Sequence, residues 1–180
     1  SQDAFKDDDL VLCVTGKVGR PIDTMMQMKI GGTLEDRLAL EGVKKIIASC
    51  PHCFHTLSHE SPQFGGNYEV IHATELVDHL IKDGKLDFKV NGQRTITYHD
   101  SCYLGRGNGI YEAPREVINS LNAEIREMKR SRSKGMCCGA GGAQMFKEAE
   151  KGDREVNVER SEEALGLKPD VIATGCPFCN

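Results

Sequence analysis

Cysteine is the residue type whose number and spacing most clearly suggest chemistry in this sequence. The chain holds eight cysteines in 180 residues. A secreted protein would use so many cysteines in disulfides, whereas a cytosolic protein more commonly uses them for metal binding or redox chemistry. The polar and acidic residues 1–9 are not typical of a signal peptide, which favours the second use. Adjacent Cys137 and Cys138 also argue against ordinary disulfides, because neighbouring side chains diverge.

Five of the cysteines form a spaced set in the second half of the chain. Cys102 is followed after 34 residues by Cys137-Cys138-Gly139, and after another 36 residues by the C-x-x-C turn of Cys176 and Cys179. A C-x-x-C turn lets two thiolates face one metal, and five thiolates exceed the four that tetrahedral zinc takes. Soft thiolates favour iron–sulfur clusters, copper(I) or zinc, and five of them indicate a multinuclear cluster. The glycines after Cys138 would let backbone N–H groups approach cluster sulfides.

The first half of the chain carries a reduced version of this set. Residues 43–53 end in C-P-H-C and are similar to residues 168–179, which end in C-P-F-C. Cys13 precedes Cys50 by 37 residues, much as Cys138 precedes Cys176 by 38. We therefore predict two related halves: residues 1–90 with a degenerate motif and residues 91–180 with a complete one. Cys13, Cys50 and Cys53 are further candidate metal ligands.

The elements that must position these cysteines alternate between strand and helix. The sequence predicts strands at 10–14, 43–48, 68–72, 95–99, 124–128 and 170–174, and helices at 33–40, 54–60, 74–82, 114–122 and 155–165. This alternation favours parallel β-α-β units, whose ligands gather beyond the carboxyl ends of the strands. Cys50, Cys102 and Cys176 each follow a predicted strand. We therefore expect an α/β fold of two pseudo-symmetric Rossmann-like halves, with the cysteines at the C-terminal ends of parallel strands.

The spaced motif resembles the cysteine-rich CCG domain that occurs in heterodisulfide reductase. The same domain occurs in iron–sulfur subunits of anaerobic glycerol-3-phosphate dehydrogenase and of lactate-utilisation proteins. The resemblance covers roughly residues 40–180 and rests on CPHCFHTL at 50–57, FGG at 64–66, HDSCYLGR at 99–106, CCGAGG at 137–142 and NVER at 157–160. It implies a [4Fe-4S] cluster, noncubane in the reductase, whose ligands would be Cys102, Cys137, Cys138, Cys176 and Cys179.

The resemblance also implies a function. The chain would be an electron-transfer component of a heterodisulfide-reductase-like complex, relaying electrons between a partner redox subunit and a disulfide, a quinone or another acceptor. Its partners would be flavin or iron–sulfur subunits and, as a further option, a membrane- or quinone-linked subunit, so we expect an oxidoreductase subunit rather than a stand-alone enzyme. The first motif departs from the family pattern, with Leu12 and Val14 where the family has cysteine and glycine. A second cluster or another metal at Cys13, Cys50 and Cys53 is therefore left open.

Net charge and the distribution of apolar residues limit the classes of partner and the cellular location that we expect. A formal net charge of -4 gives no support to nucleic-acid binding. No stretch approaches the roughly 20 apolar residues that a membrane helix needs. We expect a cytoplasmic location, either free or on the cytoplasmic membrane face. The sequence starts without Met and stops one residue after Cys179, so we expect it to be part of a longer polypeptide.

Two other functions compete with the cluster. Cys13, Cys50 and Cys53 could form a structural zinc site with His52 or His55. Alternatively, Cys50-Pro51-His52-Cys53 at the start of a helix is typical of a thiol–disulfide oxidoreductase, in which a thiolate is stabilised there. Neither function accounts for the cysteines of the second half.

Other polar residues near the motifs allow more than one interpretation. His55 and His59 could ligate metal or lie on a solvated helix face. His99 and Asp100 could hydrogen-bond a ligand or form a turn. The basic residues between 126 and 134 could offset the charge of a thiolate-bound cluster, dock an acidic partner or form a solvated loop; they are Arg126, Lys129, Arg130, Arg132 and Lys134.

Overall fold

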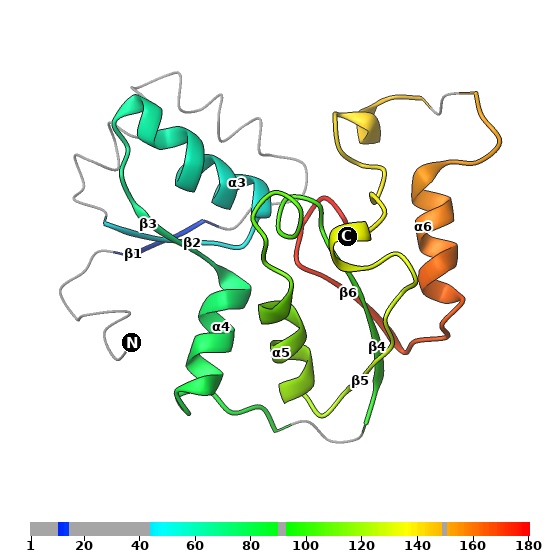
Figure 1. Ribbon diagram of the computed structural model, residues 1–180, viewed down its shortest axis with the longest axis horizontal. Coiled ribbons are helices and arrows are strands. Elements are labelled where there is room, and N and C mark those ends of the chain that lie inside the picture. The colour runs from blue at the N-terminus through cyan, green and yellow to red at the C-terminus, as the bar shows by residue number, and fades with distance from the viewer. Residues whose placement is uncertain (1–10, 15–43, 90–92, 149–150) are drawn as a thin grey trace. The chain divides into compact units, whose positions relative to one another are not determined.

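The computed structural model describes residues 11–14, 44–89, 93–148 and 151–180, with only the backbone described at 11–14. The predicted helix at 33–40 lies outside the described residues. The chain divides into two compact units, residues 1–76 and 77–180. Each unit contains a small sheet of parallel strands with helices (Figure 1). The predicted mixed α/β class with parallel strands is therefore confirmed.

The first unit is built on the three parallel strands β1 (Val11–Val14), β2 (Lys45–Ala48) and β3 (Glu69–His72), in that spatial order. In β2 the buried side chains are Ile46 and Ala48, and this alternation reflects the two-residue period of a strand. Cys50 follows β2 and precedes the helix α3 (Pro51–His55). The proline stands at the first helical position, where its missing N–H has no cost.

The helical segment after Cys50 is longer than predicted and changes its type. α3 continues without a break as the π-helix η2 (Thr56–Glu60) and the 3-10 helix η3 (Ser61–Phe64). Phe54 and Leu57 are buried. Gly65 ends the segment with φ +89°, a conformation that favours glycine. The helix α4 (Ala73–Lys82) follows β3 directly, and the division between the units falls within it.

The second unit contains β4 (Thr95–His99), β5 (Glu124–Ile125) and β6 (Val171–Thr174), in the spatial order β5-β4-β6. All pairs are parallel, with Ile96 opposite both Ile125 and Val171. The predicted strand at 124–128 pairs over only two residues. Beyond Ile125, the backbone N–H of Arg126 still donates to the carbonyl of Ile96, and Glu127 pairs with Arg115.

Helices cover both faces of the second sheet. Ile96 and Tyr98 of β4 pack with Ile118 of α5 (Glu112–Ser120) in one apolar cluster. His99 points to the opposite face, where it contacts Arg160 of α6 (Val156–Leu165). Figure 1 shows α5 and α6 on opposite sides of β4 and β6. The alternation along β4 thus separates an apolar layer from a polar one.

The remaining elements are short, and one helix start differs from the prediction. The 3-10 turns η4 (Arg132–Lys134) and η5 (Gln144–Phe146) flank the glycine-rich segment. α5 begins at Glu112 rather than at Pro114. Proline is tolerated throughout a first turn, because those N–H groups have no acceptor within the helix. None of the helices in the described ranges combines the length and apolar character that crossing a membrane requires.

Candidate metal centre

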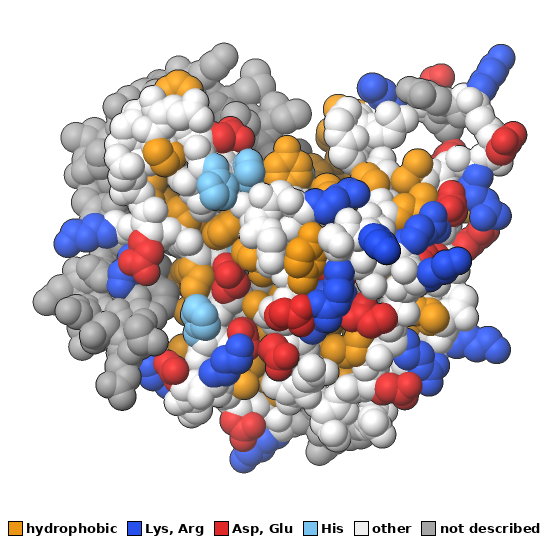
Figure 2. Space-filling view, viewed as in Figure 1, with side chains coloured by type: hydrophobic (Ala, Val, Ile, Leu, Met, Phe, Trp, Pro, Cys, Tyr) orange, Lys and Arg blue, Asp and Glu red, His pale blue; other side chains and the backbone are white. Residues whose placement is uncertain are grey.

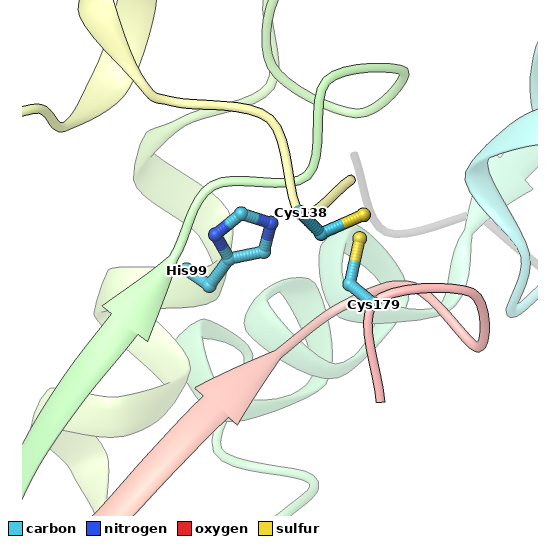
Figure 3. A group of neighbouring side chains, drawn as sticks. All are labelled: His99, Cys138 and Cys179. Carbon is cyan, nitrogen blue, oxygen red and sulfur yellow. The ribbon is translucent and has the colours of Figure 1, made fainter. Parts of the chain in front are cut away.

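Three potential metal-binding side chains, one histidine and two cysteines, converge at the carboxyl edge of the second sheet. One ligand atom each from His99, Cys138 and Cys179 lies within 4.8 Å of the others. His99 is the last residue of β4, Cys138 lies in the segment before the glycines, and Cys179 lies in the turn after β6 (Figure 3). Parallel strands place their carboxyl ends at the same edge, which is why β4 and β6 deliver these side chains together.

Hydrogen bonds link three of the thiols. Cys179 hydrogen-bonds both Cys138 and Cys176, and its backbone N–H donates to the carbonyl of Cys176 at 3.1 Å. The bond from Cys179, and secondarily His99, lowers the pKa of Cys138 to about 4. The same bonds and burial raise the pKa of Cys179, because its proton is held between neighbouring sulfurs. The thiols therefore already share protons that a metal would displace.

Cys102 and Cys137 belong to the same neighbourhood. Burial raises the pKa of the Cys102 thiol, and negative charge on Cys137 and Cys138 raises it further. The backbone N–H of Gly139 donates to the sulfur of Cys137 at 3.3 Å. The structure thus brings all five cysteines of the second motif into one region, and their role as ligands stays a prediction.

Gly139 has a backbone conformation and a close neighbour that a residue with a side chain would not tolerate easily. Its φ is +88°, and an added Cβ would lie 2.9 Å from the backbone nitrogen of Asn157, in the first turn of α6. The segment that carries Cys137 and Cys138 therefore passes very close to the start of α6. By contrast, an added Cβ at Gly141 would meet no atom within 4 Å.

A cleft of about 1070 Å³ borders this group of thiols. Its lining includes His99, Cys137, Cys138 and Cys179, together with the cationic residues Lys147, Lys151 and Arg154. The cysteines that line it are half-buried, so their side chains face the cleft without lying fully in solvent. The donor chemistry also fits an iron–sulfur cluster, because the sulfurs are soft ligands and the backbone N–H of Gly139 donates to one of them. A ring nitrogen of His99 faces the sulfurs of Cys138 and Cys179.

The adjacent residues His99 and Asp100, considered together in the sequence analysis, point in different directions and make different contacts. His99 faces Cys138 and Cys179, whereas Asp100 turns away into a buried ion pair. Arg115 of α5 binds both oxygens of Asp100, at 2.8 and 2.9 Å, and also both oxygens of Glu127. The backbone N–H of Arg132 donates to Asp100 as well, at 2.6 Å. This ion network holds the start of the loop that carries Cys102.

Arg160 is the residue near the site to which the sequence alone assigned no role. It is 4% exposed and donates from Nε to Nδ1 of His99 at 2.9 Å. Its other contacts are the carbonyl of Arg130 and the carboxylate of Glu163. The available signal in the sequence was the NVER stretch at 157–160, which ends in Arg160 and is part of the family resemblance.

The arginines of the predicted basic run are paired locally. Arg126 pairs with Glu124, Arg130 with Glu159 and Glu163, and Arg132 with Glu112. On the face drawn in Figure 2, basic and acidic side chains lie next to one another over this unit, in keeping with such pairs. These three arginines therefore neutralise nearby carboxylates rather than standing as free cations.

Two of the three first-half cysteines, Cys50 and Cys53, lie at the start of α3, and the backbone of Cys13 lies in β1. Cys50 is buried and Cys53 half-buried, while the side chain of Cys13 lies outside the described residues. A hydrogen bond from Cys53, and a smaller effect of His52, lower the pKa of Cys50 to about 4. The rings of His55 and His59 contact each other with centroids 4.8 Å apart and planes tilted by 53°. Within the described ranges, only His99, Cys138 and Cys179 group at least three metal-binding side chains this closely.

Comparison with known proteins finds one matching family and several similar oxidoreductases. Residues 96–180 match the family described as CCG, cysteine-rich domain. The probable iron–sulfur-binding oxidoreductase FadF of Bacillus subtilis is 49% identical over 138 residues, which are 76% of this chain and 19% of that protein. The EtfAB:quinone oxidoreductase of Syntrophomonas wolfei is 43% identical over 144 residues, 77% of this chain and 20% of that protein.

A third relative is itself one subunit of a larger enzyme. It belongs to the dihydromethanophenazine:CoB–CoM heterodisulfide reductase of Methanosarcina acetivorans and is 34% identical over 150 residues, 80% of this chain and 36% of that protein. The chain thus spans between 19% and 36% of the length of these three relatives. No solved structure matches it significantly.

Proposed function

Because the chain belongs, through residues 96–180, to the cysteine-rich CCG domain family, we propose that it is the iron–sulfur electron-transfer component of a heterodisulfide-reductase-like oxidoreductase complex. The observation that carries this proposal is the gathering of thiols at one sheet edge. Cys138, Cys176 and Cys179 are joined by hydrogen bonds, and the charges of Cys137 and Cys138 act on Cys102.

The five thiolates would hold a [4Fe-4S] cluster, which supplies reversible one-electron transfer when it is bound. A cubane needs four protein ligands, so a fifth thiolate favours the noncubane form. The chain itself would contribute soft negative ligands and N–H donors, and would exclude most of the water. Metal uptake displaces thiol protons, so binding would be weaker at low pH.

The partners would be other redox subunits that carry flavin or iron–sulfur groups. The names of the relatives support this, since one is a quinone oxidoreductase and another is part of a heterodisulfide reductase. The electron acceptor would be a disulfide, a quinone or a comparable group on such a partner. We place the chain in the cytoplasm or on the cytoplasmic membrane face, where a membrane- or quinone-linked subunit could meet it.

We also propose that the two halves, residues 1–90 and 91–180, are related. Their support is the repeated strand followed by C-P-x-C, at β2 with Cys50 and at β6 with Cys176. Among the described strands, β2 is central in its sheet and β6 lies at an edge. The relation would therefore reside in the strand-and-turn unit more than in the whole sheets, and it leaves open a second metal at Cys13, Cys50 and Cys53.

Iron and acid-labile sulfide analysis of anaerobically purified protein tests the proposal. We expect about four irons and about four sulfides per chain if only the second motif is loaded. Stoichiometric zinc without labile sulfide would contradict the proposal and favour a structural zinc protein. Reduction by a one-electron donor, followed by EPR, then shows whether the bound iron is redox-active.

A specific observation favours one second candidate, a thiol–disulfide oxidoreductase at Cys50 and Cys53. The lowered pKa of Cys50, together with its place before α3, would make it a thiolate at neutral pH. Such a protein would exchange thiols with glutathione disulfide without any iron, and Cys50→Ser would abolish the exchange. Persistence of the exchange in this variant excludes the candidate.

A further inference from the structure

His99 sits between a fixed cation and the thiols of the site. The ring is buried at 5% exposure, and its two nitrogens face different groups. Nδ1 accepts the hydrogen bond from Nε of Arg160 at 2.9 Å. Figure 3 shows the other ring nitrogen facing the sulfurs of Cys138 and Cys179. That atom, Nε2, is buried and makes no hydrogen bond of ordinary length among the described residues.

The arginine decides which ring nitrogen carries the proton. A guanidinium has only N–H donors and stays charged, so Nδ1 must offer its lone pair. In a neutral imidazole the proton is then on Nε2, the nitrogen that faces the sulfurs. For Nε2 to bind a metal as well, the ring would have to lose both protons and become an imidazolate. A histidine ligand normally does the opposite, donating its second N–H to an acceptor.

The cation that imposes this tautomer is itself held firmly. Nη1 of Arg160 donates to the backbone carbonyl of Arg130 at 2.9 Å and to the carboxylate of Glu163 at 3.0 Å. Glu163 also accepts from the backbone N–H and the side chain of Arg130. Turning the buried guanidinium away from His99 would therefore also cost the two hydrogen bonds that Nη1 makes to Arg130 and Glu163.

We propose that His99 is a positioning residue and not a metal ligand, and that Arg160 fixes its tautomer so that Nε2–H donates to the sulfur of Cys138 or to a sulfide bound beside it. The tautomer follows from the protein alone, whereas the sulfur bond to a cluster rests on the proposed function. An N–H donor stabilises the more negative, reduced state of a thiolate-bound cluster. His99 and the nearby charge of Arg160 therefore raise the reduction potential of the site.

The tautomer is tested on the full chain with 15N-labelled histidine. A long-range 1H–15N spectrum, with the His99 signals assigned by their loss in His99→Gln, should show the proton on Nε2. Arg160→Met should let the proton redistribute toward Nδ1. Arg154→Met is the matched control, since it removes an arginine that lines the same cleft but pairs with Glu162 at the surface. A wild-type proton on Nδ1 overturns the proposal, and this measurement does not need the cluster.

The role toward the cluster is tested by potentiometry and pulsed EPR of the loaded chain. His99→Leu should lower the reduction potential and retain the iron, and His99→Gln, which keeps an N–H donor, should lie nearer the wild type. A strongly coupled histidine 15N that disappears in His99→Gln would overturn the proposal. So would loss of iron from both folded variants, or an unchanged potential in His99→Leu. If the wild type carries no cluster, the proposed function fails, and the tautomer measurement still decides this inference.

Discussion

The cysteine thiols of the second motif differ in pKa because their surroundings differ. The pKa of Cys138 is lowered by a hydrogen bond from Cys179, while burial and neighbouring charge raise the pKa of Cys102. A metal must displace the proton of each ligand thiol, so Cys102 should be the harder of the two to deprotonate.

The first prediction concerns the five cysteines of the second motif. Single Ser substitutions at Cys102, Cys137, Cys138, Cys176 and Cys179 should each change or remove the EPR signal, because each would remove one sulfur ligand. Cys53→Ser is the control, since this half-buried cysteine belongs to the other unit. If one of the five variants keeps both spectrum and iron content, that cysteine is no ligand and a four-cysteine cubane becomes the better description.

The second prediction concerns Gly139. Gly139→Ala should lower iron occupancy, because the new methyl group would lie 2.9 Å from the backbone nitrogen of Asn157 and the backbone has φ +88°. A left-handed conformation alone costs about 1–2 kcal/mol for a residue with a side chain. Gly141→Ala in the same segment, where nothing lies within 4 Å, should keep its iron. Equal iron in both variants would show that the close approach does not position the thiols.

At the scale of elements, β4 is the organising strand of the second unit. Its alternate residues pack on α5 through Ile96 and Tyr98, and reach α6 through His99. Directly after it, Asp100 is tied to Arg115, whose guanidinium also lies 5.3 Å from the ring centre of Tyr98. The Cys102 loop therefore leaves the sheet from an anchored point.

The third prediction concerns that anchor. Asp100→Ala should destabilise the second unit by about 1.5–3 kcal/mol, because the buried Arg115 would keep only Glu127 as a carboxylate partner and the backbone N–H of Arg132 would lose its acceptor. Glu124→Gln weakens a second Arg–carboxylate pair, with Arg126, but the two side chains are 50% and 40% exposed, so the loss of stability should be much smaller than for Asp100→Ala. Hydrogen exchange of β4 and α5 amides measures both. Equal protection in the two variants would contradict a stabilising role of the ion network.

The whole molecule contains two units, each with its own parallel sheet and a C-P-x-C turn. Only the second brings a full set of thiols together in the described residues. In the first unit, α3 begins next to Cys50, a buried thiol of lowered pKa. The second candidate function, thiol–disulfide exchange, is therefore assigned to that unit.

The fourth prediction concerns this division. The double variant Cys50→Ser, Cys53→Ser should keep most of the iron and the EPR signal, because the proposed cluster ligands all lie between residues 102 and 179. Iron analysis and EPR of the folded variant measure this. Loss of all iron with circular dichroism unchanged would show that the first-half thiols are required for the cluster.

The positions of the strands, and of the cysteines that follow them, could be predicted from local sequence. Period-two runs such as residues 95–99 coincide with strands, and the strand-then-cysteine order correctly places Cys50, Cys102 and Cys176 after β2, β4 and β6. These signals are local because a strand's alternation and a turn's chemistry are written in adjacent residues. The long spacing between cysteines carried the resemblance that the matched family confirms.

Only the tertiary structure determined which polar groups meet. Arg160 lies 61 residues from His99, and Arg115 lies 15 residues from Asp100, so no local pattern relates either pair. A strand can be predicted from its alternation, but which helix covers each of its faces depends on the packing of the whole unit. The sequence by itself therefore determined the chemical type of the site, a set of soft thiolates. The fold alone decided that a histidine of fixed tautomer faces them.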